Sequence, residues 1–136
     1  MNFIKNCKNG LLILSLGISL QACSPSEKEL KLQKILDLKA WKADRGGCKS
    51  TRIAMVDSLK AAKETIRGID INAITDLMGK PDFQLLTGRN QKYYIYCLEP
   101  GVHCQDVKQG TNARTIALRF SALGIVTEIT FQRGKP

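Results

Sequence analysis

The sequence has few of the residues on which enzyme active sites most often depend. It holds one histidine, His103, and its 12 acidic residues are scattered along the chain without an evident pair. A Ser–His–Asp or Cys–His arrangement would have to use His103, which lies in a loop bounded by proline and glycine and lacks an orienting partner in the sequence. We therefore predict that His103 is a surface loop residue and that the protein is not an enzyme.

A long apolar run is also absent. The one apolar run, residues 11–20 (LLILSLGISL), has ten residues, whereas a membrane-spanning helix needs about 20. The length of 136 residues corresponds to one domain. These observations exclude a polytopic membrane protein and a large multidomain enzyme. What is abundant is positive charge, because 21 Lys and Arg residues give a net charge of +9. Such a charge suits an anionic surface or nucleic acid.

Residues 1–22 have the pattern of a secretory signal peptide, with Lys5 and Lys8 ahead of the apolar run and no acidic residue. The run ends in Leu-Gln-Ala-Cys at Cys23, which resembles the lipobox of bacterial lipoproteins. The resemblance implies cleavage before Cys23 and attachment of acyl chains to this cysteine. Ser24 in the next position, rather than aspartate, resembles the sorting rule for the outer membrane. An ordinary signal peptide that happens to precede a cysteine is the alternative.

Cleavage would change both the charge and the cysteine count. The product, residues 23–136, loses Lys5 and Lys8, so its net side-chain charge is +7 rather than +9. The signal peptide also places the product outside the cytoplasm, which argues against a nucleic-acid partner. Besides the candidate anchor Cys23, three cysteines remain in an oxidising compartment: Cys48, Cys97 and Cys104.

Three cysteines allow one disulfide bond and one free thiol. We favour Cys48–Cys104, because closing this longer loop should stabilise the fold by about 3–4 kcal/mol. Cys97–Cys104 is the alternative, and in the favoured pairing Cys97 acts as a small buried hydrophobic residue of a strand. These cysteines and His103 are zinc-ligand types, but no Cys-x-x-Cys pair is present. We therefore predict no metal site and no cofactor.

Helical periodicity begins directly after a short tether. Ser26 and Glu29 form a capping box, and apolar residues then recur at helical spacing as far as a glycine pair, which predicts one long N-terminal helix. Leu30, Leu38 and Trp41 fall on the opposite face of this helix at 100° per residue. A helix that is apolar on two faces is buried on both sides or keeps one face for a partner. We interpret these three residues as candidates for partner binding.

A second helix is predicted over residues 50–67, and a third over 71–78 between Asp70 as N-cap and Gly79 as C-terminal glycine. Four basic residues lie near one another on the second helix or at its start: Lys49, Lys60, Lys63 and Arg67. One interpretation is a solvated face with local ion pairs. The other is a basic strip that binds anionic lipid headgroups or an acidic partner.

After Asp82 the apolar spacing changes from helical to alternating. It predicts a short edge strand and three further strands, over residues 83–86, 92–98, 113–121 and 125–132. Helices followed by an antiparallel meander are typical of an α+β fold. The expected organisation has three parts: a signal peptide at 1–22, a lipidated tether with the N-terminal helix at 23–50, and an α+β domain at 51–136.

Residues 67–82 (RGIDINAITDLMGKPD) resemble the segment G-[helix cap]-x-x-x-V-x-x-L-L-G-x-P-D of the SmpA/OmlA (BamE-like) family of small bacterial outer-membrane lipoproteins. A tyrosine-rich strand and an F-x-x-x-G-x-V pattern from Phe120 to Val126 follow, as in that family. The similarity covers about residues 66–132. It implies an ααβββ arrangement, with helices packed on an antiparallel sheet of three to four strands. The long N-terminal helix and the cysteines have no counterpart in the family's best-known member, a subunit of the β-barrel assembly machinery.

The resemblance and the lipobox lead to one functional expectation. We expect a non-catalytic lipoprotein of the outer membrane, facing the periplasm and acting as a scaffold or accessory factor in outer-membrane protein assembly or envelope integrity. Its partners would be the membrane, through the acyl chains on Cys23, an envelope protein and anionic lipid headgroups. The alternative is a periplasmic inhibitor or ligand-binding module that uses the sheet face and three tyrosines: Tyr93, Tyr94 and Tyr96.

Overall fold

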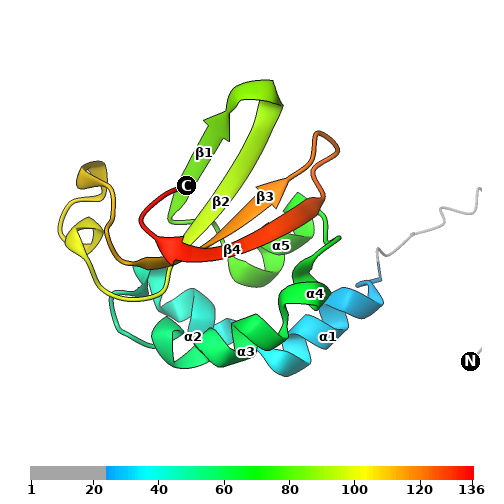
Figure 1. Cartoon of the computed structure of the whole chain (residues 1–136). Helices are drawn as coiled ribbons and strands as arrows, with labels where there is room; N and C mark the ends of the chain where they lie inside the picture. The colour runs from blue at the N-terminus through cyan, green and yellow to red at the C-terminus, as the bar shows by residue number, and fades with distance from the viewer. Residues whose placement is uncertain (1–23) are drawn as a thin grey trace, which may run out of the picture.

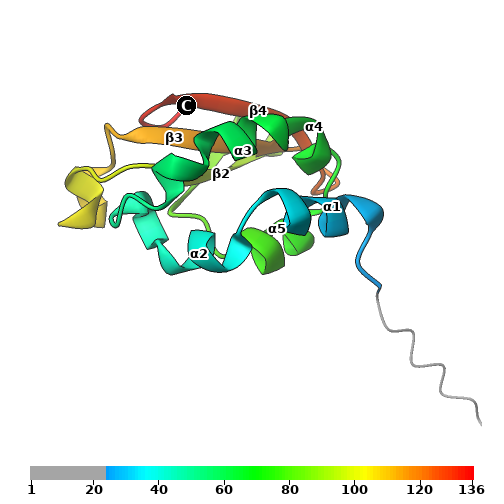
Figure 2. The ribbon, with the colours of Figure 1, turned by 90° about the horizontal axis from the view of Figure 1, so that it is seen from below.

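A computed structural model describes residues 24–136, with the helices first in the chain and a sheet after them (Figure 1). The helices cover one face of the sheet (Figure 2). The predicted α+β class and the antiparallel sheet are therefore confirmed. The predicted signal peptide and Cys23 lie outside the described residues. Within the described part, no helix combines the length and the apolarity that crossing a membrane requires.

The helical layer consists of five short α-helices and two 3₁₀ turns. The helices are α1 (Glu27–Ile35), α2 (Leu38–Ala43), α3 (Val56–Ala61), α4 (Lys63–Ile66) and α5 (Ile71–Met78), and the turns are η1 (Arg45–Gly47) and η2 (Arg52–Met55). The predicted N-caps are confirmed, because Ser26 accepts a hydrogen bond from Glu29 N and Asp70 accepts one from Asn72 N. The second bond of a capping box is replaced, since Glu29 Oε1 accepts from the Ser26 hydroxyl at 2.8 Å.

The prediction of one long N-terminal helix is wrong. Leu36 has an extended backbone (φ −121°, ψ 130°), and Asp37 begins a new helix by accepting a hydrogen bond from Ala40 N. In one continuous helix Trp41 would lie about 140° around the axis from Leu36. The break turns Trp41 toward the same core as Leu36, and both are buried. The second predicted helix is likewise divided, into η2, α3 and α4.

The sheet has four antiparallel strands in the order β1-β2-β3-β4. Their bounds are β1 Phe83–Thr87, β2 Gln91–Cys97, β3 Arg114–Phe120 and β4 Val126–Arg133. Cross-strand neighbours such as Tyr96 and Ile116, or Leu118 and Ile129, share the face that packs on the helices. Together with the buried side chains of the helices, these residues form the hydrophobic core.

The tyrosines do not form a common surface on the sheet. Tyr94 and Tyr96 point into the core. The Tyr94 ring packs edge-to-face on Phe120 with 4.9 Å between the ring centres, and the Tyr96 hydroxyl donates to Gly79 O at 2.9 Å. Burial raises the pKa of the Tyr96 phenol. Only Tyr93 lies on the opposite face, because side chains alternate along a strand. The tyrosine-lined ligand face is therefore a wrong prediction.

A buried ion pair joins the helical layer to the sheet. Arg52 is 1% exposed, and its Nη1 donates to Asp82 Oδ2 at 2.7 Å and to Cys97 O at 3.2 Å. Its Nε donates to Trp41 O at 3.1 Å, and its guanidinium carbon lies 4.4 Å from the centre of a Trp41 ring. The hydrogen bonds and the cation–π contact offset part of the cost of burying both charges.

Replacing Asp82 with alanine would leave the Arg52 guanidinium buried without its charge partner. We expect Asp82→Ala to lower the free energy of unfolding by about 3–5 kcal/mol, measured by urea denaturation. Glu64→Ala is the control, because it removes the partner of the exposed Arg67 and should cost less than about 1 kcal/mol. If both variants lose a similar amount of unfolding free energy, the buried pair has no special role.

Candidate functional site

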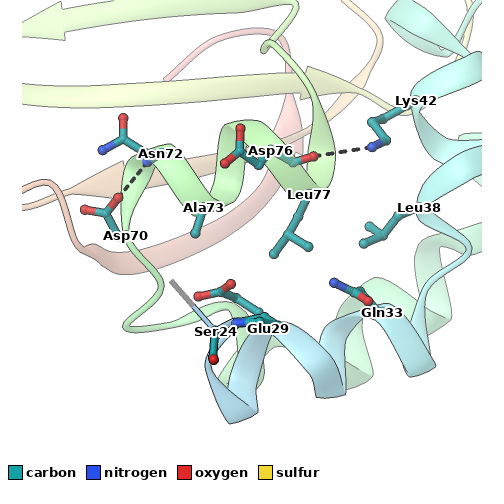
Figure 3. A pocket seen from close by; sticks show the side chains of 11 residues that line it. Ser24, Glu29, Gln33, Leu38, Lys42, Asp70, Asn72, Ala73, Asp76 and Leu77 are labelled. Carbon is teal, nitrogen blue, oxygen red and sulfur yellow. Dashed lines mark hydrogen bonds between the residues drawn. The ribbon is translucent and has the colours of Figure 1, made fainter. Parts of the chain in front are cut away.

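A groove of about 820 Å³ runs between α1, α2 and α5 (Figure 3). It begins at Ser24 and Pro25, the first described residues, and passes between the facing sides of these helices. Because Ser24 directly follows Cys23, the groove adjoins the predicted lipid anchor. Its volume is almost three times that of another hollow, about 280 Å³, beside the disulfide bond.

The floor of the groove is apolar and its rim is mainly acidic. Leu38, Ala73 and Leu77 supply apolar surface from α2 and α5. The charged residues of the lining are Glu29, Lys42, Asp70 and Asp76. Three acids against one lysine stand out in a chain whose overall charge is strongly positive. This arrangement can bind a segment with apolar side chains flanked by basic groups.

The structure separates the three predicted partner-binding residues. Leu38 lines the groove and is partly exposed. Leu30 is 45% exposed but is not among the groove residues. Trp41 is 0% exposed. The centre of its ring lies 5.8 Å from that of Tyr96, and its indole nitrogen donates to Met78 O at 3.1 Å. The expectation that Trp41 contacts a partner is therefore wrong.

The predicted basic residues do not share one helix. Lys49 precedes η2 and donates to Ala43 O at 3.3 Å, whereas Arg67 follows α4 and pairs with Glu64 at 3.0 Å. Lys60 lies on α3 and Lys63 on α4. For Arg67 the interpretation as a local ion pair is thus confirmed. A continuous basic strip along one helix is not observed, because the helix that would carry it is broken.

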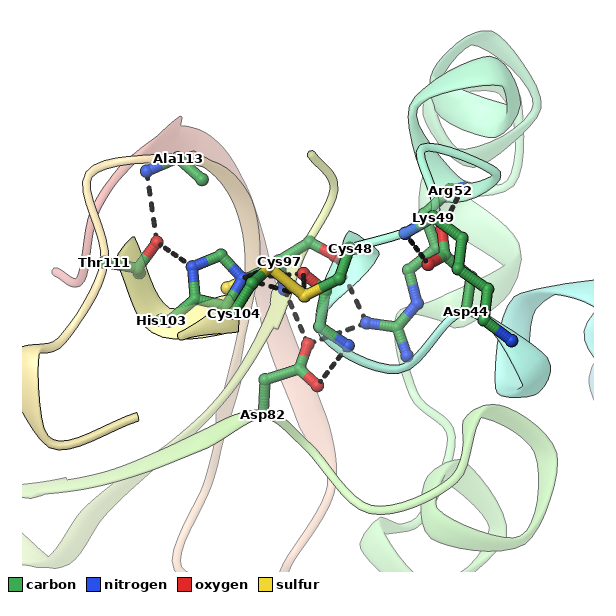
Figure 4. The surroundings of a disulfide bond; sticks show 11 residues. Asp44, Cys48, Lys49, Arg52, Asp82, Cys97, His103, Cys104, Thr111 and Ala113 are labelled. Atoms are coloured by element: carbon green, nitrogen blue, oxygen red, sulfur yellow. Dashed lines mark hydrogen bonds and ion pairs between the residues drawn. A yellow bond between two sulfur atoms is a disulfide. The ribbon is translucent and has the colours of Figure 1, made fainter. Parts of the chain in front are cut away.

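A disulfide bond joins Cys48 and Cys104, as the loop-closure argument favoured, and ties the end of η1 to the loop after β2 (Figure 4). His103 lies beside it and is 4% exposed, so its predicted place on the surface is wrong. Its Nε2 is 2.7 Å from Gly46 O and its Nδ1 is 2.9 Å from the Thr111 hydroxyl. The neutral Nε2–H tautomer satisfies both contacts, which explains how a histidine is buried here.

The ligand atoms of Cys48, His103 and Cys104 lie within 4.8 Å of one another. This is the one such group of three or more among the described residues. In the disulfide form, the two sulfurs bond each other and are not free to ligate a metal ion. Cys97, the other zinc-ligand candidate from the sequence, lies apart as a buried free thiol.

No family model matches the chain, and the searches of curated proteins and of solved structures found no match either. The candidate site therefore rests on geometry. Sequence reasoning missed most of the groove, including Glu29, Ala73 and Asp76. A signal was present for Ala73, since α5 carries a small residue between larger apolar ones, but the groove needs α1, α2 and α5 to be placed together.

The Cys97 thiol is protected by burial. Its residue is 0% exposed, and its backbone nitrogen donates to Asp82 Oδ2 at 2.8 Å. Burial raises the pKa of this thiol to about 11, with a further contribution from the nearby Asp82 carboxylate. Because the thiolate is the reactive form, Cys97 should be inert near neutral pH.

We expect iodoacetamide to leave Cys97 unmodified at pH 8 in the native protein and to modify it fully in denaturant. Only about 0.1% of a thiol with this pKa is ionised at pH 8, and burial blocks access to that fraction. Mass spectrometry of the peptide that contains Cys97 measures the modification. Leu123→Cys supplies an exposed thiol as the positive control, since Leu123 is 87% exposed. Equal rates at both sites in the native protein would contradict the prediction.

Proposed function

We propose that this protein is a non-catalytic lipoprotein that holds an envelope protein at the periplasmic side of the outer membrane. It would serve there as a scaffold or accessory factor, for example in outer-membrane protein assembly or envelope integrity. The observation that carries the proposal is the position of the groove next to Ser24, the residue after the predicted lipid anchor.

The tether determines how far the groove can lie from the membrane. Three residues, Ser24 to Ser26, separate Cys23 from the first residue of α1. An extended chain spans at most about 3.3–3.6 Å per residue, so the start of α1 can lie no more than about 15 Å from Cys23. Acyl chains on Cys23 would provide stable anchoring, since each buried CH₂ contributes about 0.8 kcal/mol and more than one chain would be present. A partner in the groove would then itself be a membrane protein or lie close to the membrane.

The chemistry of the groove defines the partner. Its apolar floor favours aliphatic or aromatic side chains, and Glu29, Asp70 and Asp76 favour a basic residue beside them. Asp70 also caps α5 through Asn72 N, which fixes its position at the rim. We therefore propose a partner segment with an apolar centre and a lysine or arginine at its edge.

The assignment as a non-catalytic protein is supported by the state of its one histidine. Both ring nitrogens of His103 are within hydrogen-bond distance of structural groups, Gly46 O and the Thr111 hydroxyl. The Thr111 hydroxyl in turn accepts from Ala113 N at 3.1 Å. A general base needs a nitrogen that is free to reach a substrate proton. His103 therefore acts in the proposal as a structural residue.

The anchor is tested by Cys23→Ser. We expect the wild-type chain to fractionate with outer membranes and to carry an acylated N-terminal cysteine, and we expect the variant to be absent from the outer-membrane fraction because it cannot be acylated. Membrane fractionation and mass spectrometry of the N-terminal peptide measure these outcomes. Cys97→Ser is the control and should keep the anchor. An unacylated Cys23, or a variant that remains in the outer-membrane fraction, would overturn the proposal.

The groove is tested by crosslinking in intact cells. A photoreactive residue at Gln33, which lines the groove, should crosslink to one envelope protein, and Ala73→Arg should reduce this product about tenfold or more by filling the floor and repelling a basic partner. Leu123→Arg is the matched control, because it adds the same charge at an exposed turn outside the groove. Immunoblotting measures the product. If Ala73→Arg and Leu123→Arg behave alike, the groove is not the binding site.

A further inference from the structure

Four basic side chains from different elements converge on a second, smaller hollow. Lys42 of α2, Arg45 of η1, Arg52 of η2 and Lys80 from the turn after α5 line a space of about 170 Å³, together with Met78 and Gly79. These residues are spread over almost 40 positions of sequence, and no single helix pattern joins them. The fold alone brings their charges together.

Arg52 has an unused nitrogen at this hollow. Its Nε and Nη1 donate to Trp41 O, Asp82 and Cys97 O, whereas Nη2 makes no hydrogen bond among the described residues. Among the residues drawn in Figure 4, no hydrogen bond reaches this terminal nitrogen. Since the side chain is 2% exposed and lines the hollow, we infer that Nη2 is the part of Arg52 that faces it. Nη2 is not one of the buried, unpartnered side-chain atoms of the described residues, so this nitrogen is open to the hollow and to a ligand there.

Positive charge is in excess around this nitrogen. Asp82 neutralises Arg52, but Lys42, Arg45 and Lys80 form no ion pair with any described acid. The C-terminal end of α5 supplies only about half a negative charge. Four basic residues set against Asp82 and this half charge leave an excess of about two and a half positive charges, which complementing the helix dipole does not explain.

The carbonyl groups next to the hollow are already occupied. Met78 O accepts from the Trp41 indole, Gly79 O from the Tyr96 hydroxyl, and Asp76 O from Lys42 Nζ at 3.3 Å. Met78 O and Gly79 O each have a donor other than the four basic side chains, whereas Asp76 O takes one N–H of Lys42. The wall of the hollow thus presents donors.

We propose that this hollow binds a phosphate group, with Arg52 Nη2 as the fixed donor and Lys42, Arg45 and Lys80 as the surrounding charges. Phosphate fits because it accepts several charged hydrogen bonds at once, which arginine and lysine donate well. Inorganic phosphate and the phosphodiester of an anionic lipid headgroup share this chemistry. The proposal does not depend on the groove or on its partner.

Trp41 provides a direct readout. It is the only tryptophan in the sequence, and its ring stacks on the Arg52 guanidinium. The full chain is placed in phosphatidylcholine nanodiscs, and sodium phosphate is added at constant ionic strength. We expect a saturable change in Trp41 emission that sodium chloride does not produce. A response that is absent, or equal for both salts, would overturn the proposal.

Two double variants test whether the change in Trp41 emission comes from phosphate bound in this hollow. Arg45→Gln with Lys80→Gln should weaken phosphate binding about tenfold or more, because both charges lie at the hollow. Lys60→Gln with Lys63→Gln removes the same charge from α3 and α4 and should leave the affinity unchanged. Arg45 and Lys80 are exposed, and emission without phosphate checks that the fold is intact. Equal weakening in both variants would contradict the site.

The source of the phosphate group is distinguished in a second arm. Nanodiscs that contain phosphatidylglycerol are measured without added phosphate. If the emission already has its phosphate-bound value and added phosphate changes nothing, a lipid headgroup fills the site. If only added phosphate changes the emission, the ligand is a free phosphate. Both results support the site, and a phosphatidylglycerol effect that persists in Arg45→Gln with Lys80→Gln would overturn it.

Discussion

The Asp82 carboxylate is the constraint on which the arrangement of this domain depends. It accepts from Arg52 Nη1, from Gly46 N at 2.9 Å and from Cys97 N at 2.8 Å, so one buried group joins η2, η1 and the end of β2. Buried carboxylates are tolerated only when several donors surround them. The helical layer is held to the sheet at this point by polar contacts of defined geometry, in addition to the non-directional packing of the core.

The same contact brings the disulfide partners together. Gly46 and Gly47 approach the sheet so closely that a Cβ at Gly47 would lie 2.7 Å from Leu98 C and 2.8 Å from Cys97 O. With a φ of +66° as well, this position requires glycine. Once the two glycines lie against β2, the following Cys48 reaches Cys104. The disulfide bond therefore secures an approach that hydrogen bonds and a missing side chain make possible.

The sequence was sufficient to predict the helices and strands that have strong local signals. Asp70 and Gly79 bracket α5 as predicted. Alternation identified β3 and β4, and a run of β-favouring residues identified β2, because caps and strand patterns act over a few residues. The prediction for Trp41 failed because the helical wheel assumed a continuous helix, whereas Asp37 caps a new one. The prediction for His103 failed because its acceptor and donor come from Gly46 and Thr111, which only the folded chain places beside it.

Lys42 connects the groove and the basic hollow. It lines both, its Nζ donates to Asp76 O, and its Cγ lies 3.3 Å from the position of a Cβ on Gly79. Lys42 is the one basic residue of an otherwise acidic groove rim, and it is also one of the four charges around Arg52 Nη2. The ammonium group of Lys42 has three N–H donors, so it can keep its bond to Asp76 O, but an anion in the hollow would neutralise its charge. An anion bound in the hollow would therefore leave the groove more acidic, and any coupling between the two sites would act in both directions.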